Sequence, residues 1–134
     1  MSNFGINLHY ITVATKQHPV LDKIIERVKK QNEQMIILGL NENRQIGWEG
    51  TGNFGVKLRE TRDFVFNENI RPQDIVLFTD AYDVVYGGSQ IEVLKRFIQQ
   101  HKPIMFGCES QCHPDKEDSS KFIYCSCSSL SKNG

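Results

Sequence analysis

The sequence predicts an α/β fold with an open, mainly parallel sheet and helices on both of its faces. Along the 134 residues, strand-like runs alternate with segments of helical periodicity. Several of those runs are continuously apolar, as in strands that are buried on both faces. Ligands of such folds bind at the carboxyl ends of the strands, so a site is expected along that edge.

The predicted elements follow one another as strand, helix, strand, loop, helix, strand, helix and strand. We expect strands at residues 8–13, 35–40, 74–78 and 103–107, and helices at residues 19–28, 57–67 and 91–98. Pro19 suits the first position of a helix. Ser89 and Glu92 have the spacing of a capping box before the last helix.

Composition narrows the class of protein. Lys plus Arg and Asp plus Glu both number 16, so the basic excess that is typical of nucleic-acid-binding domains is missing. No apolar run approaches the roughly 20 residues that span a bilayer. The first seven residues lack the basic and apolar regions of a secretory signal. We therefore expect a cytoplasmic protein with no nucleic-acid partner and no transmembrane segment.

The four cysteines, Cys108, Cys112, Cys125 and Cys127, all lie in the last quarter of the chain. A disulfide scaffold would spread its cysteines more widely. The C-x3-C and C-x-C spacings also fit the usual zinc motifs poorly, although a four-thiolate zinc site remains an alternative. Free thiols are the favoured interpretation.

Asp80 and Asp83 directly follow an apolar strand, and apolar residues resume after them. Carboxylates beside a core strand are usually paired or bound to a metal. Their oxygens suit a divalent cation such as Mn²⁺ or Mg²⁺, with a phosphate group on its other side. This pattern points to chemistry on a nucleotide or a nucleotide sugar. The alternative is that Asp80 caps a turn and Asp83 is a surface charge.

Two further segments are expected near the same edge. The turn at residues 12–16 could approach a base or ribose through its backbone, or be an ordinary connection. In the glycine-rich loop at residues 47–57, Trp48 could stack on a sugar or base and Lys57 could offset diphosphate charge. The alternative is a flexible surface loop. The G-x-G-x-x-G pattern at residues 50–55 lies too far from the second strand for a dinucleotide site.

After the predicted fourth strand, Glu109 and His113 could touch an acceptor or act as a base. Simple exposure of these side chains is the favoured interpretation.

Five segments together resemble the glycosyltransferase domain of the procollagen lysyl hydroxylase/glucosyltransferase family, which has relatives in large DNA viruses. They are LHYITVATK, ILGLNENRQIGWEG, GVKLRETRDF, DIVLFTDAYDVVYGGSQIEVLKRF and IMFGCESQCHPD, and they cover roughly residues 8–115. The resemblance implies a GT-A-like (Rossmann-like) fold, Mn²⁺ or Mg²⁺, and UDP-glucose or UDP-galactose as donor. It also implies transfer of a hexose to hydroxylysine or galactosyl-hydroxylysine of collagen-like chains.

The resemblance further implies two sets of site residues. The metal ligands would be Asp80 and Asp83. The nucleotide-sugar-binding residues would be Val13, Ala14, Thr15, Trp48, Lys57, Asp80, Ala81 and Tyr82.

The chain departs from the family pattern near its C-terminus. The family's acceptor-side strand and later metal-binding histidine have no counterpart, and His113 stands where the family has Trp. We therefore expect a C-terminally truncated domain over residues 1–124, incomplete at its C-terminus, and a disordered Cys/Ser-rich tail over residues 125–134. A partner chain would then complete the fold. Cellular members of the family work in the endoplasmic reticulum, whereas a viral relative without a signal would stay in the host cytoplasm.

Two alternative functions remain at this stage. One is a catalytically inactive remnant that binds UDP or metal. The other is a phosphotransferase or phosphohydrolase that uses the aspartate pair, which is disfavoured because such folds usually place the nucleophilic aspartate after the first strand.

Overall fold

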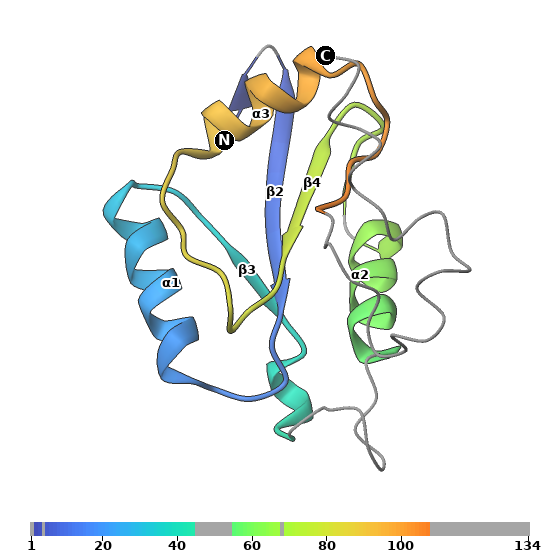
Figure 1. Cartoon of the computed structure of the whole chain (residues 1–134). Coiled ribbons are helices and arrows are strands. Elements are labelled where there is room, and N and C mark those ends of the chain that lie inside the picture. The colour runs from blue at the N-terminus through green and yellow to red at the C-terminus, as the bar shows by residue number, and fades with distance from the viewer. Residues whose placement is uncertain (1, 4, 45–54, 68, 108–134) are drawn as a thin grey trace, which may run out of the picture. The chain divides into compact units, whose positions relative to one another are not determined.

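The computed structural model describes residues 2–3, 5–44, 55–67 and 69–107 (Figure 1). Contacts divide the chain into two units, Met1–Gln100 and His101–Gly134. All the helices and strands within the described residues belong to the first unit. None of these helices has the length and apolar character needed to cross a bilayer. The predicted tail at residues 125–134 lies outside the described residues.

The sheet is built around β2, which lies between two parallel neighbours (Figure 1). The strands are β1 (Ser2–Asn3), β2 (Ile6–Val13), β3 (Ile36–Leu38) and β4 (Ile75–Thr79). Thr12 of β2 lies opposite Ile37 of β3 and Thr79 of β4, so the three strands end side by side. β1 pairs antiparallel with the start of β2. The predicted open, mainly parallel sheet is confirmed.

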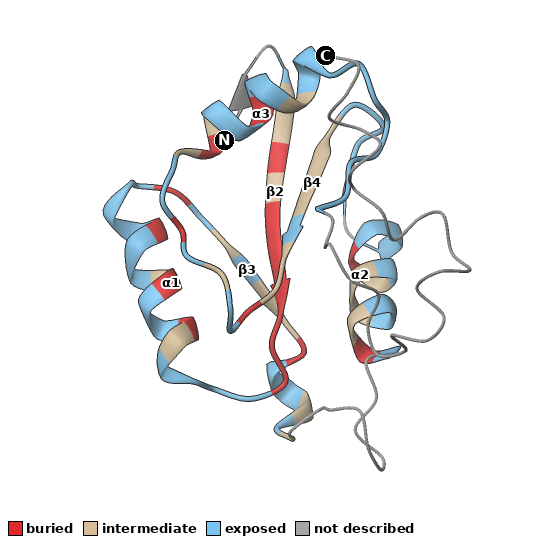
Figure 2. Cartoon of the chain, viewed as in Figure 1, coloured by how far each residue is buried: buried red, intermediate tan, exposed pale blue. Residues whose placement is uncertain are grey.

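The helices cover both faces of this sheet, as predicted. They are α1 (Pro19–Lys30), α2 (Gly55–Asn67) and α3 (Gln90–Gln99), and a short 3₁₀ helix, η1, spans Leu40–Glu42. Tyr10 of β2 packs in one apolar cluster with Ile24 of α1 and Leu94 of α3. The neighbouring His9 points to the opposite face, where its ring meets Phe64 of α2 with centroids 6.2 Å apart. Figure 2 shows the buried residues along β2 and on the side of α1 that faces the sheet.

Side chains cap two of the helices. His18 precedes Pro19, and its Nδ1 accepts a 3.1 Å hydrogen bond from the amide of Val20. Ser89 Oγ accepts from the amide of Glu92 at 3.3 Å, which is half of the predicted capping box. The other half does not form, because the Glu92 carboxylate pairs with Arg96 one turn later.

The predicted strand at residues 103–107 is wrong, since the structure has neither helix nor strand there. Its apolar side chains Ile104, Met105 and Phe106 are exposed. An apolar run forms a strand only when a neighbour supplies a hydrogen-bonded ladder, and no such ladder forms for these residues within the described part of the chain.

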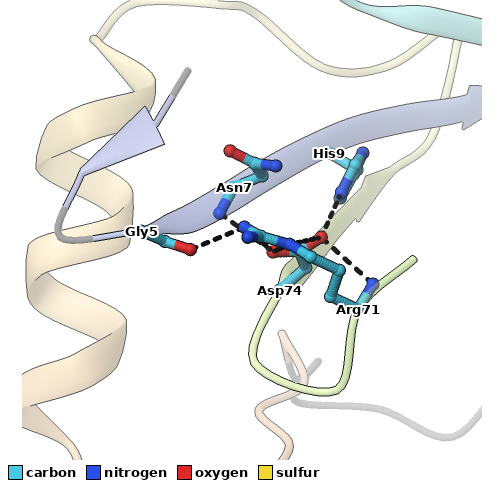
Figure 3. Close-up of polar contacts among 5 residues, drawn as sticks. All are labelled: Gly5, Asn7, His9, Arg71 and Asp74. Carbon is cyan, nitrogen blue, oxygen red and sulfur yellow. Dashed lines mark hydrogen bonds and ion pairs between the residues drawn. The ribbon is translucent and has the colours of Figure 1, made fainter. Parts of the chain in front are cut away.

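A polar cluster fixes the start of β4 beside the start of β2 (Figure 3). The Asp74 side chain is 1% exposed and accepts hydrogen bonds from the Asn7 amide (3.1 Å) and the Arg71 guanidinium (2.8 Å). His9 Nε2 lies 3.2 Å from the same carboxylate, and Arg71 also donates to the carbonyl of Gly5. These contacts join segments more than sixty positions apart, at the end of the strands opposite to the candidate site.

Candidate functional site

The carboxyl ends of β2 and β4 are tied together by side-chain hydrogen bonds. Thr12 Oγ1 donates to the carbonyl oxygen of Thr79 at 2.7 Å. The Tyr10 hydroxyl lies 2.9 Å from Thr79 Oγ1, and burial raises the pKa of this phenol, so it stays protonated. Beyond these strand ends, Ala14 and Ala81 pack in one small apolar cluster. The structure thus brings the turn after β2 and residues 80–83 together, as their positions in the sequence predict.

Val13, the last residue of β2, and the turn residues Ala14 and Thr15 are almost fully buried, with exposed fractions of 2%, 0% and 1%. Residues 39–44 pack against this turn: the Ala14 amide donates to the Leu38 carbonyl, and the Arg44 amide donates to the Thr15 carbonyl. Gly39 has a φ of +87°, which favours glycine, and this conformation leads the chain from β3 into η1. This turn is therefore buried beneath residues 39–44 at the carboxyl ends of the strands and is not solvent-exposed.

Lys57 and Asp80 form an ion pair at the same edge. Lys57 belongs to the first turn of α2, and its Nζ lies 2.5 Å from Oδ1 of Asp80, the residue directly after β4. The two side chains are 27% and 44% exposed, so solvent reaches both. The packing of Val56 and Phe64 against the sheet holds α2 in place and brings Lys57 to this position. The two residues were predicted separately, as a loop cation and a metal ligand.

Asp83 is exposed on the segment that follows Asp80. Within the described residues, no group of three or more His, Cys, Asp or Glu side chains is arranged to hold a metal ion. Two carboxylates still fit a hard divalent cation such as Mg²⁺, which commonly binds one or two carboxylates and completes its shell with water and phosphate oxygens. The donor chemistry of Asp80 and Asp83 therefore suits such an ion.

Tyr82 links the aspartate segment to the loop before α1. Its hydroxyl donates to the carbonyl of Lys16 at 2.9 Å, and its ring meets the edge of His18 with centroids 5.2 Å apart. Reasoning from the sequence did not single out His18 or Thr79. The one signal for His18 was the following Pro19, which marks it as the residue that caps α1. Thr79 carries no sequence signal, because its contacts depend on the register of β2 and β4.

Several residues singled out in the sequence lie outside the described part of the chain. They are Trp48, Cys108, Glu109, Cys112, His113, Cys125 and Cys127.

Comparison with known proteins matches residues 5–127 to the family described as PLOD GT domain. A procollagen-lysine,2-oxoglutarate 5-dioxygenase of Drosophila melanogaster is 30% identical over 115 residues, which is 86% of this chain. Human procollagen-lysine,2-oxoglutarate 5-dioxygenase 2 is 30% identical over 84% of the chain. The multifunctional procollagen lysine hydroxylase and glycosyltransferase of Caenorhabditis elegans is 29% identical over 79%.

The chain spans only a small part of these relatives. The matched segment covers 16% of the Drosophila protein and 15% of the human and Caenorhabditis proteins.

Proposed function

The chain belongs to the PLOD GT domain family, and on this premise we propose that it acts as a metal-dependent hexosyltransferase. Its donor would be UDP-glucose or UDP-galactose. Its acceptor would be hydroxylysine or galactosyl-hydroxylysine in collagen-like chains. The names of the relatives, which include a procollagen lysine hydroxylase and glycosyltransferase, support this choice of reaction.

The observation that carries the proposal is the meeting of three segments at the carboxyl edge of the sheet. The buried turn after β2, Asp80 directly after β4 and the ammonium of Lys57 all lie there. Open α/β sheets bind their ligands at this edge. The carboxylate of Asp80 paired with the ammonium of Lys57, and the exposed carboxylate of Asp83 three residues later, suit a metal ion and a diphosphate.

Each residue then has a proposed role. Asp80 and Asp83 hold Mn²⁺ or Mg²⁺, which when bound stabilises the negative charge that develops on the departing diphosphate. Lys57 adds positive charge beside it. Catalysis of this kind is mainly electrostatic, because the side chains hold charge in place around the departing diphosphate.

The nucleotide would lie over the turn after β2. Since Val13, Ala14 and Thr15 are buried, we propose that they form a floor under the uridine, and that residues 39–44 shift to admit it. Ala81 and Tyr82 would flank the nucleotide from the other segment. Trp48 would contact the donor sugar.

A transfer assay tests this function. Purified protein is incubated with Mn²⁺, with UDP-glucose or UDP-galactose, and with a collagen-like peptide that carries hydroxylysine or galactosyl-hydroxylysine. We expect glycosylated peptide and UDP from the wild type, and at least a hundredfold less from Asp80→Asn. Asp63→Asn is the matched control and should keep activity, because this α2 carboxylate is 44% exposed, as is that of Asp80. Binding of UDP without turnover would instead support the alternative of a catalytically inactive remnant.

A further inference from the structure

The ion pair between Lys57 and Asp80 occupies an oxygen that the proposed metal would need. We propose that Lys57 is an exchangeable counter-ion: it neutralises Asp80 in the ligand-free protein and moves to the diphosphate when the divalent ion binds. This inference rests on the proposed function, because it takes Asp80 as a metal ligand. It adds a second role for Lys57, which is to oppose metal binding when no nucleotide is present.

The Lys57 ammonium and the proposed metal ion would compete for the carboxylate of Asp80. The Lys57 ammonium lies 2.5 Å from Oδ1 of Asp80, so that oxygen already has a cation at contact distance. A divalent cation on either oxygen of the same carboxylate would lie close to the ammonium. At such short range the two positive charges repel strongly, even with partial solvent screening. The metal therefore binds well only when Lys57 has moved.

Lys57 is placed so that it can move without unfolding α2. The helix is fixed to the sheet by the neighbouring Val56, which is 1% exposed, whereas the Lys57 side chain is 27% exposed. A lysine head group sits on a flexible four-carbon stem, so it can change partners while its backbone stays fixed. Lys57 also lies in the first turn of α2, and the N-terminal end of a helix dipole favours a nearby anion.

The net charge of the three side chains favours binding of the metal ion first and of the diphosphate second. Asp80, Asp83 and Lys57 together carry a net negative charge, which attracts a divalent cation and repels a diphosphate. With the cation bound, the same three side chains and the metal carry a net positive charge, which attracts the diphosphate. Lys57 then pairs with the diphosphate in place of Asp80. Metal and nucleotide should therefore bind cooperatively, each favouring the other.

Removal of the Lys57 charge should change the two affinities in opposite directions. In Lys57→Met, Asp80 loses its competing cation, so Mn²⁺ alone should bind roughly two- to fivefold more tightly. The diphosphate loses a charged partner, so UDP at saturating Mn²⁺ should bind roughly tenfold more weakly. A purely structural role for Lys57 would weaken both.

The experiment titrates Mn²⁺ alone and then UDP at saturating Mn²⁺, by calorimetry and by the water-proton relaxation of bound Mn²⁺. Lys57→Arg keeps the charge and should leave both affinities within about threefold of the wild type. Lys23→Met, on the exposed side of α1, is the control for loss of a surface charge. Lys57→Gln replaces Lys57→Met if the latter does not keep the wild-type circular dichroism and thermal midpoint.

The outcomes separate this inference from the function on which it rests. Opposite changes in the two affinities support the exchange. If the wild type binds both Mn²⁺ and UDP, but Mn²⁺ alone binds the neutral variant no more tightly, the exchange is overturned and the proposed function stands. If the folded wild type binds neither, both fail.

Discussion

Thr12 donates its side-chain hydroxyl to the carbonyl oxygen of Thr79 at 2.7 Å, and this bond ties the central strand to the residue directly before Asp80. Thr12 is 1% exposed, so its hydroxyl has little access to water as an alternative partner. The position of Asp80 therefore depends on a buried polar contact between two strands as well as on the backbone ladder.

Replacement of Thr12 with Val removes this hydroxyl and keeps the shape of the side chain. We expect the free energy of unfolding to fall by about 1 kcal/mol, since the Thr79 carbonyl loses a buried partner. Chemical denaturation measures the change. The same exchange at Thr61, a half-buried position of α2, should change the free energy by less than about 0.5 kcal/mol. Equal effects at the two positions would show that the Thr12 bond is unimportant.

Gly39 is required for its backbone conformation. With φ at +87°, an alanine there is strained, although its Cβ would meet the nearest atoms at an ordinary 3.5 Å. Gly39→Ala should lower the free energy of unfolding by about 1–2 kcal/mol. Gly87→Ala is the control, because its Cβ would enter open space and its φ is not in the left-handed region. A neutral Gly39→Ala would contradict this account of the turn after β3.

Glu33 is a buried carboxylate that holds two donors. It accepts from the Tyr86 hydroxyl and from the Gln90 amide at the start of α3, both at 2.6 Å. A glutamine offers only one acceptor oxygen, so Glu33→Gln should lower the free energy of unfolding by about 1–3 kcal/mol. Glu26→Gln, on the exposed face of α1, should change it little. A neutral Glu33→Gln would mean that α3 does not depend on this contact.

Asp74 should make stability depend on pH in the acid range. The hydrogen bonds from Arg71, together with those from Asn7 and His9, hold the pKa of Asp74 well below its usual range. Because its pKa is lower in the folded state than in the unfolded state, the Asp74 carboxylate stabilises the fold. This contribution to the free energy of unfolding is complete above the unfolded pKa and is lost as pH falls towards the folded pKa. The thermal midpoint should thus decline as pH drops below about 4, the ordinary pKa of an aspartate.

Asp74→Asn tests this dependence. The variant has no carboxyl group at this position to protonate, so its thermal midpoint should be lower near neutral pH and should fall less steeply towards pH 2. Thermal melts followed by circular dichroism between pH 7 and pH 2 give both quantities. Parallel curves for the two proteins would rule out Asp74 as a source of the acid dependence.

Local sequence patterns predicted most of the fold. The signals are clearest for α1 and α3, which combine apolar periodicity with a capping residue or a first-turn proline. Local patterns failed where the structure of a segment depends on its contacts with other parts of the chain. The apolar run at residues 103–107 has the composition of a strand, but a strand also needs a ladder partner. The second strand was predicted to reach Leu40, yet it ends at Leu38 because Gly39 turns the chain.

The candidate site was predicted only in part, because local sequence patterns do not encode tertiary contacts. Strand order places the carboxyl ends of β2 and β4 at one edge, so the meeting of the turn with Asp80 could be foreseen. The burial of Val13, Ala14 and Thr15 could not, because it depends on residues 39–44. The contact between Lys57 and Asp80 depends on how α2 packs, which no local pattern encodes.

The central claim is that Asp80 and Asp83 hold a metal that in turn holds a nucleotide diphosphate. Its most direct test is calorimetric titration of UDP into the purified protein, with and without Mn²⁺, repeated on Asp80→Asn/Asp83→Asn. The account predicts that Mn²⁺ strengthens UDP binding at least tenfold in the wild type, and that the folded double variant loses this effect. Equal UDP binding with and without Mn²⁺, or an undiminished Mn²⁺ effect in the double variant, would contradict it.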